Sequence, residues 1–142
     1  MPVVKLTLFS LDEANRLVKQ LGPDFDRLML AQRELDRLET RVAALSLAVA
    51  GADAENPDAL DLVKLNQRRG VLARQIAEGV RSIHESGALV KDLREGLIDF
   101  YALSGDRLLF LCWKVGEAEI AHWHTLEGGF ASRQPLHRIE PE

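Results

Sequence analysis

The sequence has one cysteine, a small acidic net charge and no long apolar run, and each of these scarcities excludes a class of protein. Cys112 has no second cysteine to pair with, which excludes an internal disulfide and fits a reducing cytoplasm. The net charge of −4 provides no basic surface for phosphate backbones, so we expect no nucleic-acid binding. No stretch reaches the roughly 18 apolar residues that a membrane span needs. Residues 1–9 lack the apolar core of a signal peptide, so we expect an unprocessed cytoplasmic protein.

Motifs that define a reaction are also missing. Gly128-Gly129 has neither a following lysine nor a strand-loop-helix setting, so it does not predict a phosphate-binding loop. No His-Glu-x-x-His motif occurs, and no histidine lies beside a nucleophile motif. Cys112 lies in the most apolar segment, where a structural cysteine is favoured over a reactive thiolate. Motifs therefore assign no enzymatic activity.

In the first half of the chain, apolar residues recur mostly three or four positions apart. These residues are Ala14, Leu17, Leu21, Leu28, Ala31, Leu35, Leu38, Val42, Leu45 and Val49. The spacing places them along one side of a long helix, which we predict over about residues 11–50. Gly22-Pro23 predicts a kink in this helix rather than a loop, because Leu21 and Leu28 keep the stripe in phase across it.

A second helix is predicted over about residues 57–86. Asn56 and Pro57 are typical of an N-cap and a first helical position, and Gly87 is typical of the residue that ends a helix. The short connection requires the two helices to lie antiparallel, as a coiled-coil-like hairpin. Gly70 and Gly79 each cost about 1 kcal/mol relative to alanine inside a helix. They indicate either a tolerated weakness or a close approach of the two helices.

The apolar pattern then changes to a period of two, which predicts β-structure. The predicted strands span residues 97–102, 107–115 and 119–124. Ser104-Gly105-Asp106 predicts a hairpin turn between the first two strands. The second strand is almost continuously apolar, so we expect it at the centre of the sheet.

The predicted fold class is α+β: a long N-terminal antiparallel helical hairpin followed by a small three-stranded antiparallel β-meander. We expect the helical part, residues 1–87, and the sheet part, residues 88–142, to form a single folding unit. The tail from Leu126 is rich in glycine, proline and charge, which predicts a loop that wraps the sheet.

The first predicted helix is too long for a small sheet to cover. About 40 helical residues extend roughly 60 Å. Further apolar residues widen the stripe beyond a two-helix contact, namely Leu30, Ala44, Leu47 and Ala48. Pairing two hairpins into a four-helix bundle buries them, whereas the alternative is a sheet that folds back over the excess. We therefore expect a homodimer or a higher homo-oligomer.

Several short strings, taken together, resemble one family over about residues 7–135. The strings are Phe9-Ser10-Leu11-Asp12-Glu13-Ala14-Asn15, Val90-Lys91-Asp92-Leu93, Gly96-Leu97-Ile98-Asp99-Phe100, Leu111-Cys112-Trp113, Gly116-Glu117, Trp123-His124 and Gly129-Phe130-Ala131-Ser132-Arg133. Their order and spacing resemble the bacterial family known as domain of unknown function 2203. The resemblance implies an N-terminal helical pair and a small C-terminal β part, and implies nothing about a substrate.

His122 and His124 are the candidate ligands for a divalent metal. Residues two apart on a strand project from the same face, so both imidazoles can reach one cation. A third ligand would come from Cys112, Asp99, Glu117 or His137. The alternative is a pair of ordinary strand histidines beside a core tryptophan. The family pattern stresses Trp123-His124 rather than a His-x-His pair, which weakens any role for His122.

A small polar ligand pocket is the other candidate site on the sheet. It would be lined by Asp99, Trp113, Glu117, Trp123, His124 and Arg133. The alternative, which we favour, is a structural ion pair in which Arg133 anchors the tail loop to the sheet. Charges on the helical hairpin are typical of a solvated helix face.

These observations favour a non-enzymatic, oligomeric structural or interaction protein of the cytoplasm. The alternative is a metal- or small-ligand-binding enzyme whose site lies on the C-terminal sheet. No cofactor is predicted other than the divalent metal of that alternative, and the predicted partner is a second copy of the chain.

Overall fold

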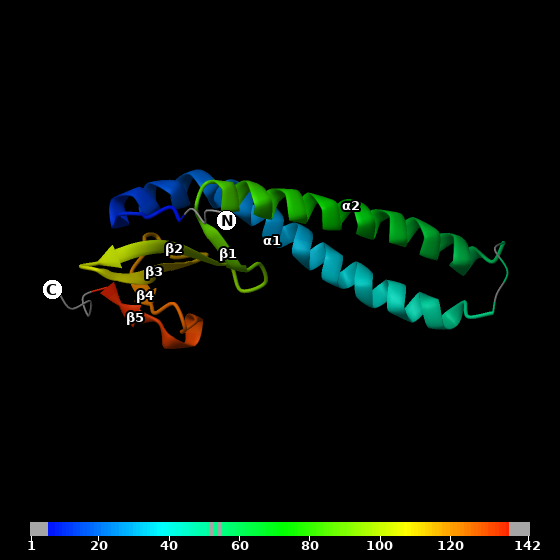
Figure 1. The fold of residues 1–142 in the computed structure, drawn as a ribbon. Helices are drawn as coiled ribbons and strands as arrows, with labels where there is room; N and C mark the ends of the chain where they lie inside the picture. Colours follow the sequence, from blue (N-terminus) through cyan, green and yellow to red (C-terminus); the bar gives the residue numbers. More distant parts are fainter. Residues whose placement is uncertain (1–5, 52, 54, 137–142) are drawn as a thin grey trace, which may run out of the picture.

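Two long helices are followed by an antiparallel sheet in the computed structural model, which describes residues 6–51, 53 and 55–136 (Figure 1). The elements in chain order are α1 (Leu11–Ala48), α2 (Pro57–Glu85), β1 (Leu89–Asp92), β2 (Leu97–Ser104), β3 (Arg107–Lys114), β4 (His122–His124), the short 3-10 helix η1 (Phe130–Ser132) and β5 (Gln134–Pro135). The predicted α+β class and the helical pair are therefore confirmed.

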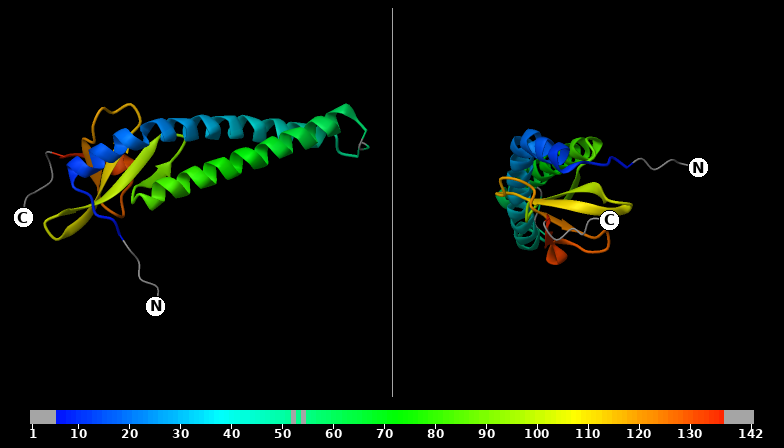
Figure 2. Two further views of the ribbon diagram at one scale, coloured as in Figure 1. Left: turned by 90° about the horizontal axis from the view of Figure 1, so that it is seen from above. Right: turned by 90° about the vertical axis from the view of Figure 1, so that its left-hand side faces the viewer.

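Helix α1 begins at a capping box and continues through Pro23. The Ser10 hydroxyl accepts a hydrogen bond from the backbone N–H of Glu13, and the Glu13 carboxylate accepts one from the backbone N–H of Ser10. Pro23 has no N–H to donate and its ring crowds the preceding turn. Helix α1 therefore bends at the end of its N-terminal part, drawn in blue, and does not break into a loop (Figures 1 and 2).

Helix α2 begins and ends where its flanking residues predict. The Asn56 side chain accepts a hydrogen bond from the backbone N–H of Asp58, and Pro57 takes the first helical position. After Glu85 the chain passes through Ser86 to Gly87, whose φ of 99° lies in the left-handed region that glycine adopts without strain. Strand β1 follows directly.

The sheet has five strands in the order β1-β2-β3-β4-β5, all antiparallel, so the prediction of three strands was wrong in number. The central pair, β2 and β3, was predicted, and β3 lies in the middle of the sheet. Strands β1 and β5, which are four and two residues long, were not predicted. Elements this short carry too few residues for an alternating pattern to be recognised.

The third predicted strand is shorter in the structure, because β4 covers only His122–His124. The segment before it is held by contacts to other elements. The backbone N–H of Ile120 donates to the Asn15 side chain on α1, at 2.8 Å, and the Trp113 indole donates to the Glu117 carbonyl, at 3.0 Å. Residues 117–121 therefore form a loop packed against α1.

The main apolar core lies between α1 and one face of the sheet. Residues of α1 in this core are Ala14, Val18, Phe25, Leu28 and Met29, and those of the sheet include Ile98, Phe100, Leu111, Trp113 and Trp123. Because side chains alternate along strands, the sheet residues between these point away from the helices. The same core includes Ile83 of α2, so both helices and the sheet share it.

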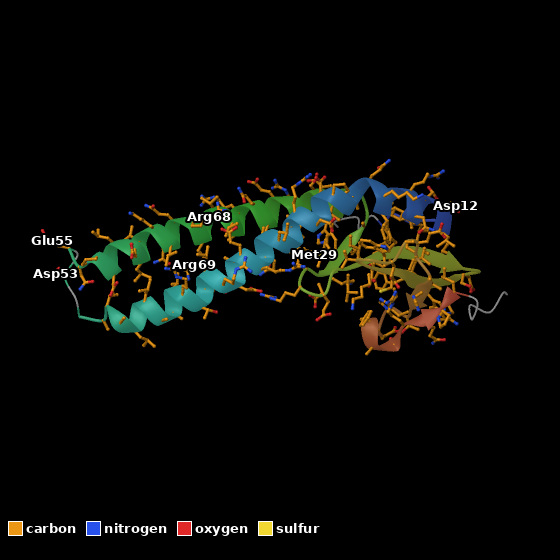
Figure 3. All side chains as sticks on the ribbon, turned by 180° about the vertical axis from the view of Figure 1, so that it is seen from behind. Asp12, Met29, Asp53, Glu55, Arg68 and Arg69 are labelled. Atoms are coloured by element: carbon orange, nitrogen blue, oxygen red, sulfur yellow. The ribbon has the colours of Figure 1, made fainter. Side chains whose placement is uncertain are left out.

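The far half of the hairpin projects beyond the sheet. Figure 3 shows Asp53 and Glu55 at the end farthest from the sheet, whereas Asp12 lies beside it. With 38 residues, α1 is about 57 Å long. A smaller apolar cluster of Leu35, Leu38, Leu72 and Ile76 joins the helices here, and an ion pair between Arg68 and Glu34 bridges them. The turn between β1 and β2 reaches the near end of this part, where Leu93 packs against the cluster and Arg94 pairs with Asp36. Beyond that point the hairpin extends away from the sheet (Figure 2).

The two helix glycines have different surroundings. A β-carbon at Gly79 would lie 2.4 Å from Cδ2 of Leu28 on α1, whereas one at Gly70 would have only the Arg74 guanidinium within 4 Å, at 3.8 Å. Gly79 therefore marks a close approach of α1 and α2, and Gly70 is a helix position with open space around it.

Candidate functional site

Polar and titratable side chains gather on the sheet face that points away from the helices. Asp99 of β2 is opposite Cys112 of β3, which in turn is opposite His122 of β4. His124 lies two residues further along β4 and therefore projects from the same face. The strand register thus brings together residues that are up to 25 positions apart in the sequence.

Asp99, Cys112 and His124 form a compact group, which we call the Asp99 cluster. Their ligand-type atoms all lie within 4.8 Å of one another. The three residues are only 2%, 1% and 3% exposed. Nε2 of His124 lies 2.8 Å from Oδ2 of Asp99, and the Phe110 ring packs beside the imidazole, with ring centroids 5.3 Å apart. The cluster is therefore a buried polar centre in an otherwise apolar strand environment.

Hydrogen bonding fixes the orientation of the His124 ring. Its Nδ1 lies 2.8 Å from the carbonyl oxygen of Thr125, which can only accept, so Nδ1 carries a hydrogen. Its Nε2 faces the Asp99 carboxylate, which also accepts when ionised. A single shared proton therefore holds His124 and Asp99 together. The second carboxylate oxygen, Oδ1 of Asp99, is buried and has no hydrogen-bond partner.

Burial determines the ionisation of this cluster. It raises the pKa of Asp99, and the neighbouring His124 ring and Cys112 thiol oppose that increase. Burial, with the nearby Asp99 carboxylate, raises the pKa of Cys112 to about 12. At neutral pH Cys112 is therefore a thiol and not a nucleophilic thiolate. Asp99, and not His124, is the neighbour in the cluster that affects the pKa of the thiol, so the three residues do not have the order of a nucleophile-base-acid triad.

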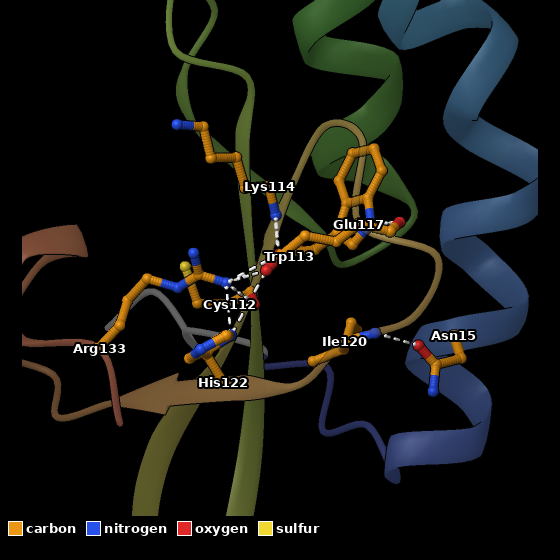
Figure 4. Close-up of polar contacts among 8 residues, drawn as sticks. All are labelled: Asn15, Cys112, Trp113, Lys114, Glu117, Ile120, His122 and Arg133. Atoms are coloured by element: carbon orange, nitrogen blue, oxygen red, sulfur yellow. Dashed lines mark hydrogen bonds and ion pairs between the residues drawn. The ribbon is translucent and has the colours of Figure 1, made fainter. Parts of the chain in front are cut away.

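A second polar group lies beside the first, around the side chain of Arg133 (Figure 4). Its Nη2 donates to both Glu117 carboxylate oxygens, at 2.7 and 2.9 Å, and to Nδ1 of His122, at 3.0 Å. It also lies 3.3 Å from the carbonyl oxygen of Cys112. The Glu117 carboxylate further accepts the backbone N–H of Lys114, at 2.7 Å. Arg133 thus joins the segment after β4 to the central strand.

The six residues predicted to line one ligand pocket are divided among three places in the structure. Asp99 and His124 belong to the buried cluster. Glu117 and Arg133 form the ion pair, with Trp113 hydrogen-bonded to the backbone of Glu117. The indole of Trp123 lies in the apolar core on the helix side of the sheet, with no hydrogen-bond partner for its N–H. Ligand binding by these residues stays a prediction.

The two histidines predicted as metal ligands share a face but have different partners. His124 contacts Asp99, whereas His122 contacts Arg133 and lies 3.4 Å from the Glu117 carboxylate. Metal binding by His122 with His124 stays a prediction. Of the third ligands considered, Asp99 and Cys112 lie beside His124, and His137 lies outside the described residues.

The residue pattern of β2 and β3 gives one indication of this cluster in the sequence. Asp99 and Cys112 lie inside two strands whose charged or hydroxyl residues otherwise lie mostly at the strand ends, as Ser104, Arg107 and Lys114 do. The two residues are directly opposite each other on neighbouring strands. The register that pairs them depends on the Ser104–Arg107 turn, which fixes which residue of β2 is opposite each residue of β3.

The fold defines a class of α+β protein in which a projecting helical hairpin and a five-stranded meander share one core. The model of a family described as "Uncharacterized conserved protein (DUF2203)" matches residues 7–136, and the chain belongs to this family. No curated protein and no solved structure matches the chain. Within the described residues, no helix combines the length and apolar character needed to cross a membrane.

Proposed function

We propose that the chain is a non-enzymatic structural or interaction protein that self-associates through its helical hairpin. The observation that carries this proposal is a set of large apolar side chains exposed along the two helices: Leu30, Leu47, Leu60, Val63 and Val71. Leu47 is 82% exposed and Leu30 is 60% exposed. Apolar side chains grouped on a projecting element are typical of an interaction surface.

The exposed apolar residues of α2 form a stripe on the side away from α1. Leu60, Val63 and Val71 recur at helical spacing and so share one side of the helix. Leu65 and Leu72, by contrast, pack with α1 in the smaller apolar cluster. Successive helical residues are turned by about 100°, so Val63 and Leu65 project in nearly opposite directions. Another helix can therefore cover the stripe without displacing α1.

Charge on α2 favours a second copy of this chain as the occupant. Near the stripe, Asp61 lies close to the start of α2, and Lys64 and Arg74 lie further along it. Antiparallel pairing of two copies around a two-fold axis brings the acidic start of one α2 beside the basic middle of the other. The two hairpins then form a four-helix bundle, which covers the apolar stripe of each. The single cysteine favours a cytoplasmic setting for this assembly.

Sedimentation of the full chain at micromolar concentration tests the proposal. We expect a species of at least twice the 15.9 kDa mass of the chain. A variant with both Leu60→Glu and Val63→Glu places two charges in the stripe, and we expect it to be monomeric with unchanged helical circular dichroism. Leu103→Glu is the matched control, because Leu103 is 53% exposed on β2, outside the hairpin. A monomeric wild-type chain, or an oligomer that the double variant leaves intact, would refute self-association through this stripe.

A further inference from the structure

The geometry points to Asp99, Cys112 and His124 as a binding site for one thiophilic divalent cation of the zinc class. The three ligands come from β2, β3 and β4, so the ion would connect the three inner strands of the sheet. The site differs from the His122–His124 pair that strand alternation indicates, since His122 is not part of it. It is also independent of self-association through the hairpin.

The donor set is the first reason for this assignment. A cysteine sulfur, an imidazole nitrogen and a carboxylate are the ligands that zinc takes, at about 2.0–2.3 Å from the ion. Tetrahedral coordination at those distances separates neighbouring ligand atoms by about 3.3–3.6 Å. In the cluster all ligand atoms lie within 4.8 Å of one another, and Nε2 of His124 is 2.8 Å from Oδ2 of Asp99. Small side-chain rotations therefore suffice to admit the ion.

The orientation of His124 is the second reason. Metal-binding histidines usually donate their other ring N–H to a carbonyl or a carboxylate, which fixes the ring and directs the free nitrogen at the ion. His124 has this arrangement, with Nδ1 bonded to the Thr125 carbonyl and Nε2 directed at Asp99. A cation between Nε2 and the carboxylate would take the place of the proton that joins them.

An unpartnered oxygen is the third and independent reason. Oδ1 of Asp99 is buried without a hydrogen bond, although the residue is only 2% exposed. Buried polar groups are usually paired, so this oxygen requires an explanation, and a bound cation supplies one. Coordination by the Asp99 carboxylate, with the Cys112 sulfur and the His124 nitrogen, would give the ion three protein ligands and give Oδ1 a partner.

The surrounding charges oppose a cation only in part. Lys91 and Arg133 are close enough to affect Asp99 and Cys112, respectively. Arg133, however, is neutralised by its ion pair with Glu117. Asp99 and an ionised Cys112 together supply two negative charges for a divalent ion. The site is enclosed, so we expect the ion to stabilise the sheet and not to bind substrate.

Titration of the untagged full chain with Co²⁺ and with Zn²⁺ tests the site. Cobalt bound to the Cys112 thiolate is expected to give a sulfur-to-metal charge-transfer band, and Zn²⁺ is expected to abolish it at one equivalent per chain. Zn²⁺ is also expected to raise the midpoint of thermal unfolding, because it binds the folded chain in preference to the unfolded one. Absence of the band in the wild-type chain overturns the proposal, whatever the behaviour of the variants.

Two variants identify the ligands. Cys112→Ser is nearly isosteric, and we expect it to remove the band and to weaken Zn²⁺ binding at least about tenfold. His122→Gln is the matched control, since His122 lies on the same strand face outside the cluster, and its affinity is expected to equal that of the wild type. Wild-type affinity in Cys112→Ser overturns the assignment, as does an equal loss in His122→Gln. If Cys112→Ser does not fold, the wild-type band and its one-equivalent end point decide the question.

Discussion

Replacing each helix glycine by alanine separates the two explanations for glycine in α2. Alanine is favoured over glycine inside a helix by about 1 kcal/mol. Gly70→Ala places its methyl group in open space and is therefore expected to raise the free energy of unfolding by about 1 kcal/mol. For a chain of this length, such a gain corresponds to about 3 °C in the unfolding midpoint.

Gly79→Ala has the same helix propensity gain but meets Leu28. The new β-carbon would lie 2.4 Å from Cδ2 and 3.1 Å from Cγ of a leucine that is only 8% exposed. Relieving such overpacking costs about 1–3 kcal/mol. For Gly79→Ala we therefore expect the free energy of unfolding to fall by up to about 2 kcal/mol, whereas Gly70→Ala is expected to raise it. Urea denaturation followed by circular dichroism measures both.

A double-mutant cycle with Leu28→Ala tests the cause of that loss. Leu28→Ala removes the atoms that the new methyl group meets, so in this background Gly79→Ala is expected to be stabilising, as at Gly70. The coupling free energy between the two sites should then be about 1–3 kcal/mol. A Gly79→Ala variant stabilised as much as Gly70→Ala would contradict a close contact between Gly79 and Leu28. Additive effects of the substitutions at positions 28 and 79 would contradict it as well.

Three further predictions concern stability. Phe25 is fully buried beside Trp113, with ring centroids 6.0 Å apart, and Phe25→Ala is expected to cost about 3–5 kcal/mol in urea denaturation. Ser10→Ala removes the N-cap acceptor of α1 and is expected to cost about 1 kcal/mol in the same assay; no loss would contradict the capping role. Hydrogen bonds from Arg94 lower the pKa of Asp36 from its usual 3.8, so this pair stabilises the fold above that pH and the contribution is lost as pH falls through the lowered pKa. Asp36→Asn should flatten that acid dependence in a pH series of unfolding curves, and an unchanged slope would count against it.

The helical part of the fold could be predicted because its determinants are local. A capping residue, an apolar stripe and a proline act within one or two turns of the chain, so Ser10, Pro23 and Asn56 indicate the helix boundaries and the bend directly. The glycines were ambiguous for the opposite reason. Whether Gly79 or Gly70 meets another helix depends on Leu28, which is 51 residues from Gly79 and whose position only the packed hairpin determines.

The sheet was predicted less completely because its determinants are distant. Strand β1 is held by pairing with β2, and β5 by pairing with β4, so neither needs a strong pattern of its own. The loop before β4 depends on Asn15, which is 105 residues away and accepts the Ile120 N–H. The candidate sites show the same limit: alternation places His122 and His124 on one face, but the strand register determines that His124 joins Asp99 and Cys112.

The position of the Asp99 cluster shows that packing of the helices does not require it. The residues that bury α1 lie on the other face of the sheet, so apolar residues in the cluster would leave that core unchanged. A buried carboxylate oxygen without a partner costs about 1–3 kcal/mol, and replacing buried ionic groups by apolar ones is often neutral or stabilising. The cluster thus carries a free-energy cost that the fold itself does not explain. A cation bound to the carboxylate, the sulfur and the imidazole removes that cost by coordinating the unpartnered oxygen, and so accounts for three residues that helix packing leaves unexplained.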